Sequence, residues 1–149
     1  MTVKISAAAV IGVAVLGASY AALRAQAPPS RSVWDGVYTE EQAKRGEPLY
    51  NKNCAACHGE TLEGIEMAPA LVGGDFLDKW AGETLGDLFE RIRATMPKEK
   101  PGRLSREINA DITAYMLRVN EFPPGKVELP RDTQILKQIR IDAVKPEGK

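Results

Sequence analysis

The sequence is poor in the residues from which most metal and disulfide sites are built, with two cysteines and one histidine in 149 residues. A structural zinc site takes four nitrogen or sulfur ligands, so zinc is excluded unless two chains share the ion. An excess of one charge is also missing, because 20 basic residues balance 20 acidic ones. A nucleic-acid binder carries a basic stripe, and that class is therefore excluded.

All three of these rare residues lie in one stretch, Cys54 to His58, in the order Cys-Ala-Ala-Cys-His. This spacing is typical of covalent haem c attachment. Each thiol adds to one vinyl group of a single haem, and the adjacent imidazole binds the iron as an axial ligand. The alternatives are a redox-active dithiol or a metal site shared between chains. A thioredoxin-like dithiol requires a strand before the motif and a helix opening after it, and the sequence indicates neither.

The N-terminus favours export. Lys4 precedes an apolar run over residues 5–23, and the run is followed by Ala25-Gln26-Ala27, a pattern typical of signal-peptide cleavage. The run also approaches the length of a membrane span, so an uncleaved anchor facing the periplasm is the alternative. We expect a signal peptide over residues 1–27 and a mature periplasmic chain of about 120 residues, enough for one domain.

The mature chain is predicted to form one domain with two flanking segments. Residues 28–38 are a linker and apolar lead-in, residues 39–122 the domain, and residues 123–149 a charged C-terminal extension. The extension holds an apolar cluster over residues 135–141, which either docks on the domain as a short helix or contacts a partner subunit. No strand alternation and no internal repeat stand out, which favours an all-α fold.

The first predicted helix covers about residues 40–53. Thr39 precedes it as a cap, and the side chain of Gln42 is expected to complete a capping box with Thr39. Pro48 lies inside the helix and removes one backbone donor, which predicts a kink or a late start.

Two more helices are predicted from caps and apolar spacing. One covers about residues 85–94 behind Thr84, and the other is a long helix that begins after Ser105. The glycine-rich stretch 59–82 lies between the motif and the first of these two helices. It is expected to wrap around a ligand, with one or two helical turns at 75–80.

A haem bound by His58 has a sixth position to fill, and a second histidine is absent. Three methionines remain after signal removal: Met67, Met96 and Met116. Met116 falls on the apolar face of the last helix and is better interpreted as a core residue. Met67 follows His58 by nine residues, which leaves little chain to reach the opposite haem face. Met96 lies 38 residues beyond His58, on a loop before Pro97, and is the favoured ligand.

Together these residues resemble the mono-haem c-type cytochromes of the mitochondrial-like class, particularly the bacterial cytochrome c domains found beside terminal oxidases and quinoprotein dehydrogenases. The likeness covers about residues 39–120 and is strongest at the attachment motif and the Met-Pro pair. The family has a small residue, an aromatic residue and the first cysteine at i, i+4 and i+8, matched here by Gly46, Tyr50 and Cys54. The resemblance implies that Gly46 lets the last helix cross closely near Tyr115.

The resemblance also implies roles for three residues outside the motif. Pro69 matches a proline whose carbonyl accepts the proximal imidazole N–H, and Leu71 matches a leucine that packs against the haem. Trp80 matches a tryptophan near the buried propionate, although a plain core tryptophan is an equally good interpretation. Pro48 departs from the family pattern, and the extension beyond residue 130 is longer than the family core.

The resulting prediction is an all-α cytochrome c fold, with three main helices plus short helices and loops around one haem c bound through Cys54 and Cys57. Its function is periplasmic electron transfer on a haem ligated by His58 and Met96, without enzymatic activity. The expected partners are redox proteins: a dehydrogenase, an oxidase or a quinol-oxidising complex. The alternative is a peroxidase or gas sensor with an open sixth position. Peroxidase chemistry normally uses a distal acid–base residue, and the absent second histidine weighs against it.

Overall fold

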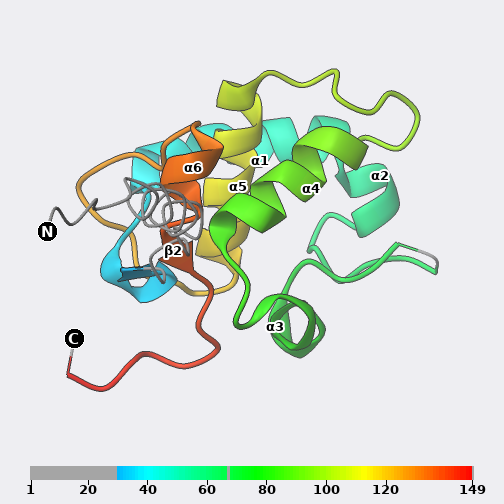
Figure 1. The fold of residues 1–149 in the computed structure, drawn as a ribbon. Helices are drawn as coiled ribbons and strands as arrows, with labels where there is room; N and C mark the ends of the chain where they lie inside the picture. Colours follow the sequence, from blue (N-terminus) through cyan, green and yellow to red (C-terminus); the bar gives the residue numbers. More distant parts are fainter. Residues whose placement is uncertain (1–29, 67, 149) are drawn as a thin grey trace, which may run out of the picture.

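The computed structural model describes residues 30–66 and 68–148, and the predicted signal peptide lies outside them. Helices dominate these residues (Figure 1), which confirms the all-α prediction. The elements in chain order are β1 (Arg31–Ser32), a 3-10 helix (Val33–Asp35), α1 (Glu40–Asn53), α2 (Ala55–His58), α3 (Gly73–Trp80), α4 (Leu85–Thr95), α5 (Arg106–Val119), α6 (Thr133–Leu136) and β2 (Ile139–Arg140). Within the described ranges, no helix is both long enough and apolar enough to cross a membrane.

α1 begins at its predicted cap, where the Thr39 hydroxyl accepts the backbone N–H of Gln42 at 3.1 Å. The second half of the predicted capping box is wrong. The Gln42 side chain instead donates from Nε2 to the Leu129 carbonyl at 3.1 Å and accepts the Leu129 N–H on Oε1 at 2.6 Å. This buried amide satisfies both of its polar ends on the C-terminal extension. The late start is also wrong, because α1 runs from residue 40 through Pro48.

α4 and α5 also begin at their predicted caps. Thr84 Oγ1 accepts the Asp87 N–H at 3.2 Å, and the Asp87 carboxylate accepts the Thr84 N–H at 3.3 Å. Ser105 Oγ accepts the Ile108 N–H at 3.2 Å. Each cap contributes about 1 kcal/mol to helix stability. These local signals explain why the sequence located the helix starts well.

α1 and α5 cross in close contact at Gly46, as predicted. A Cβ atom at this position would lie 1.9 Å from the Asp111 carbonyl oxygen and 2.9 Å from the Tyr115 Cβ. Beside the crossing, the ring centroids of Tyr50 and Tyr115 are 5.3 Å apart. The crossing therefore holds the C-terminal half of α1, which leads into the attachment motif, directly against α5.

We expect Gly46→Ala to lower the free energy of unfolding by ~3 kcal/mol, because the added methyl group meets backbone atoms that no rotamer change can move. Guanidinium unfolding of the haem-loaded protein measures the loss. Gly74→Ala is the matched control, since a Cβ at Gly74 of α3 meets nothing within 4 Å. Equal stability of the two variants would show that the α1–α5 crossing tolerates a side chain.

The C-terminal extension packs onto the domain. β2 pairs in parallel with β1, and α6 packs against α4. The Trp34 indole N–H donates to the Asp142 carbonyl at 2.9 Å. Ile135 is 52% exposed. The rest of the apolar cluster is completely buried: Leu136, Ile139 and Ile141. The extension thereby joins the lead-in segment to α4.

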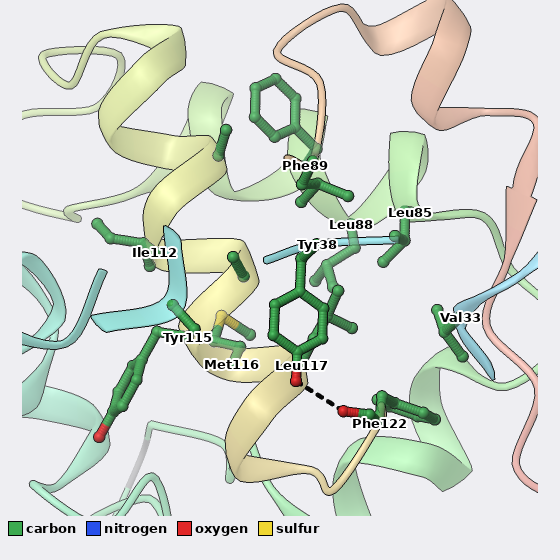
Figure 2. Packing of buried hydrophobic residues seen from close by; sticks show 14 of the residues in the cluster. Val33, Tyr38, Leu85, Leu88, Phe89, Ile112, Tyr115, Met116, Leu117 and Phe122 are labelled. Atoms are coloured by element: carbon green, nitrogen blue, oxygen red, sulfur yellow. Dashed lines mark hydrogen bonds between the residues drawn. The ribbon is translucent and has the colours of Figure 1, made fainter. Parts of the chain in front are cut away.

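The hydrophobic core lies between α1, α4, α5 and these terminal segments. Figure 2 shows Tyr38 of the lead-in within the buried cluster, where its hydroxyl donates to the Phe122 carbonyl oxygen at 2.6 Å. Burial raises the pKa of Tyr38 to about 12, which keeps the hydroxyl protonated as a donor. α5 contributes Ile112 and Met116 to the same cluster. Both of these side chains also line the cavity described next.

Candidate functional site

A cavity of about 680 Å³ lies between the end of α1, α2, α4 and α5. Cofactor and ligand pockets occupy about 300 to 1,000 Å³, so its size suits a large ligand. It is lined by all seven residues that the sequence analysis expected at the site: Cys54, Cys57, His58, Pro69, Leu71, Trp80 and Met96. Residues distributed over more than forty positions of the chain therefore meet at one cavity.

The attachment motif forms the end of α1 and the whole of α2, a short helix that the sequence did not predict. Cys54 ends α1 by donating its backbone N–H to the Tyr50 carbonyl at 2.8 Å. Its own carbonyl accepts the N–H groups of Cys57 and His58 at 3.1 and 2.9 Å, which closes the turn. Burial raises the pKa of the Cys54 thiol to about 11, against an opposing effect of the Arg103 charge. A redox-active dithiol has a lowered thiol pKa, so this environment does not favour that alternative.

His58 is held in one orientation by the loop that follows it. The imidazole is 8% exposed, and Nδ1 donates to the Pro69 carbonyl oxygen at 2.8 Å. Because a carbonyl only accepts, the proton resides on Nδ1 and the lone pair of Nε2 stays available for a metal. The loop is closed by the Leu71 N–H, which donates to the Leu62 carbonyl at 2.7 Å.

Two methionines reach the cavity from different helices. Met96 is half-buried at the end of α4, where its N–H donates to the Ile92 carbonyl at 2.9 Å. Met116 is 1% exposed on α5 and belongs both to the core and to the cavity lining. Met67 lies outside the described residues.

Two cations that the sequence analysis did not single out, Lys79 and Arg91, also line the cavity. Lys79 Nζ lies 5.9 Å from the Trp80 ring centroid. Among the described residues, neither cation has an acidic partner and the Trp80 indole N–H has no hydrogen-bond acceptor. Leu88, Arg91 and Thr95 of α4 share one helical stripe that faces the cavity. This spacing is a signal that groups Arg91 with the apolar Leu88 on one face of the helix.

The loop 97–103, beyond Met96, folds back onto the end of α1. Lys100 donates its N–H to the Pro97 carbonyl at 3.0 Å, which forms a turn. Arg103 Nη2 donates to Asn53 Oδ1 at 2.5 Å. This contact joins the loop to the residue directly before the attachment motif.

Comparison with known proteins finds a matching sequence family and curated relatives. Residues 41–116 match the sequence family described as cytochrome C oxidase, cbb3-type, subunit III. Cytochrome c-551 of Bacillus subtilis (strain 168) is 38% identical over 65 residues, which cover 42% of this chain and 54% of that protein. The cbb3-type cytochrome c oxidase subunit CcoP of Azospirillum brasilense is 33% identical over 90 residues, which cover 56% of this chain and 30% of that protein.

One solved structure is also similar, that of the sulfane dehydrogenase SoxCD from Paracoccus pantotrophus. The identity is 26% and the TM-score is 0.44, over 60% of this chain and 53% of that one. The chain thus spans about half the length of the first curated relative and less than a third of the second.

Proposed function

Because this chain belongs to the cbb3-type cytochrome c oxidase subunit III family of cytochrome c domains, we propose that it is a periplasmic electron carrier with one haem c. The family implies haem c and electron transfer. Cys54 and Cys57 would hold the haem, and His58 and Met96 would ligate the iron. The observation that carries this proposal is that one cavity gathers both thiols, the imidazole and the thioether. When bound, the haem supplies a one-electron ferric/ferrous couple.

The residues around His58 suit an axial ligand. The hydrogen bond from Nδ1 to the Pro69 carbonyl, 2.8 Å long, fixes the ring and raises its basicity toward the metal. Leu71 lines the same cavity and adds apolar surface. With Nδ1 engaged by the Pro69 carbonyl, Nε2 is the ring nitrogen left to bind iron.

Met96 suits the second axial position. It reaches the cavity from the end of α4, whereas His58 reaches it from α2, so two separate elements would hold the iron between them. The loop after Met96 is fastened to α1 by the contact between Arg103 and Asn53. Ligation by a soft thioether raises the reduction potential, which suits a carrier that delivers electrons to an oxidase.

Polar groups that α3 and α4 bring to the cavity lining suit the haem propionates. Lys79 and Arg91 bring two positive charges to the lining, and Trp80 brings an indole N–H that has no acceptor among the described residues. A carboxylate would accept that N–H and be balanced by the two cations. Trp80 would then donate a hydrogen bond to a haem propionate as well as pack against the core.

Part of the remaining lining is apolar and would limit the access of water to the haem. Leu88, Ile92 and Ile112 contribute apolar walls from α4 and α5. Cys57 is exposed, and we propose that electrons leave through the haem edge beside it. Electron transfer requires no general acid or base, so the chain's task is to hold the ligands, keep the pocket dry and present this edge.

The partners are proposed to be redox proteins. CcoP is by name a subunit of a cbb3-type oxidase, which supports an oxidase. A dehydrogenase or a quinol-oxidising complex is the other kind of partner that the electron-carrier function admits. Co-purification followed by mass spectrometry would identify which of them binds.

Retention of the haem on a denaturing gel, combined with a reductive titration, tests the proposal. We expect the peroxidase stain to stay with the protein band and one electron equivalent to reduce each chain. Stain in the dye front would overturn covalent attachment. More than one equivalent per chain would overturn the assignment of a single haem as the redox centre.

Signal-peptide cleavage after Ala27 is a separate prediction, based on residues outside the described part of the structure. The small residues Ala25 and Ala27 flank the expected site. The intact mass of the exported protein should equal that of the chain from Pro28 plus one haem. Recovery of the full-length chain in the membrane fraction alone would support the uncleaved anchor.

A further inference from the structure

The rim of the cavity near the motif is apolar. Ala56, Cys57 and Pro69 line the cavity and are exposed. Ile65, which also lines the cavity, is 50% exposed and is one of four large apolar side chains this accessible in the described part of the chain. Exposed apolar surface beside a functional site is typical of a region that a partner covers.

One loop beside this rim, residues 59–66, is acidic. It contains Glu60, Glu63 and Glu66 and no basic residue. All three carboxylates are exposed, and none forms an ion pair with a described residue. Glu66 lines the cavity, which places this negative charge at its opening.

A second loop at the same cavity, residues 97–103, is basic. It contains Lys98, Lys100 and Arg103 against the single acid Glu99. Lys98 and Glu99 line the cavity, and Lys98 and Lys100 are exposed without an ion pair to a described residue. Figure 1 shows α2 between the two loops, with the basic loop in yellow-green and the acidic loop in blue-green. Opposite charges therefore flank the exposed end of the motif.

Resting on the electron-carrier function, we propose that this rim is the docking surface for a redox protein with a bipolar face. The partner's face would carry an apolar centre between a basic area, opposite residues 59–66, and an acidic area, opposite residues 97–103. A uniformly charged face would be attracted by one loop and repelled by the other. The two loops thus select the partner and fix its rotation about the rim.

Electron exchange with two small probes of opposite charge tests the proposal. The ferrous protein gives one electron to hexacyanoferrate(III), a trianion, or to tris(phenanthroline)cobalt(III), a trication. At low ionic strength, Lys98→Glu with Lys100→Glu should slow the anionic probe about tenfold and accelerate the cationic probe. Glu60→Lys with Glu63→Lys should do the opposite.

Matched reversals outside the two loops control for net charge. Lys44→Glu with Lys126→Glu, and Glu41→Lys with Glu121→Lys, make the same changes at exposed residues elsewhere. These pairs should change either rate less than about threefold at the same ionic strength. Equal haem content and equal spectra will show that all variants are folded.

The bipolar surface is overturned if either loop pair behaves like its control pair. Dependence on the lysines alone or on the glutamates alone would show a surface of a single sign. If the wild-type protein exchanges no electrons with either probe, the electron-carrier function itself fails. That outcome is distinguishable, because it appears before any charge is reversed.

Discussion

Met96→Ala is expected to convert a closed, low-spin haem site into one with an open sixth position. The ferric protein should lose its near-infrared sulfur-to-iron charge-transfer band, and the ferrous protein should bind carbon monoxide at once. The reduction potential should fall, because a soft thioether stabilises ferrous iron. Absorption spectroscopy and a potentiometric titration measure these three changes.

Met116→Leu is the control for this variant. Met116 also lines the cavity and is completely buried, so its sulfur is the rival donor among the described residues. As a volume-conserving core change, the substitution should cost under ~1.5 kcal/mol of stability and leave the band in place. If the band is lost in Met116→Leu and survives in Met96→Ala, Met116 and not Met96 is the axial ligand of the iron.

Cys54→Ser combined with Cys57→Ser is expected to abolish covalent haem attachment. These are the chain's two cysteines, so no other thiol replaces them. The exported variant should show no haem stain on a denaturing gel. Its yield should fall sharply, because a cavity of about 680 Å³ would lose its filling.

His58→Ala separates attachment from ligation. The two thiols remain, so the haem stain should stay with the chain. The low-spin spectrum should disappear, because the chain has no second histidine to take over. A low-spin spectrum that survives this change would show that His58 does not bind the iron.

The parts of this protein that the sequence predicted depend on local chemistry. Thr84 and Ser105 cap helices within three or four residues of themselves. The motif was identified from its spacing, Met96 from its distance along the chain and Pro69 from the family resemblance, and the structure brings all of them to one cavity. The close contact at Gly46 followed from the family resemblance.

The parts that the sequence missed depend on contacts between distant residues. Gln42 stands at the position that a capping box requires, so the sequence predicted a local partner for its side chain. The folded structure shows that the side chain instead bonds to Leu129 of the extension, 87 positions away. The pairing of β1 with β2 joins residues more than a hundred positions apart. Two-residue strands are too short to leave an alternating pattern. The helical spacing places Arg91 on one stripe with Leu88 and Thr95, but the sequence pattern does not say that this stripe faces the cavity.

The absorption spectrum of the purified wild-type protein, before and after carbon monoxide is added to the reduced form, tests whether His58 and Met96 both bind the iron. Ligation by both His58 and Met96 predicts a low-spin ferric spectrum with the near-infrared band, and only slow binding of carbon monoxide. A high-spin protein that binds carbon monoxide at once would contradict the account and favour a peroxidase or gas sensor.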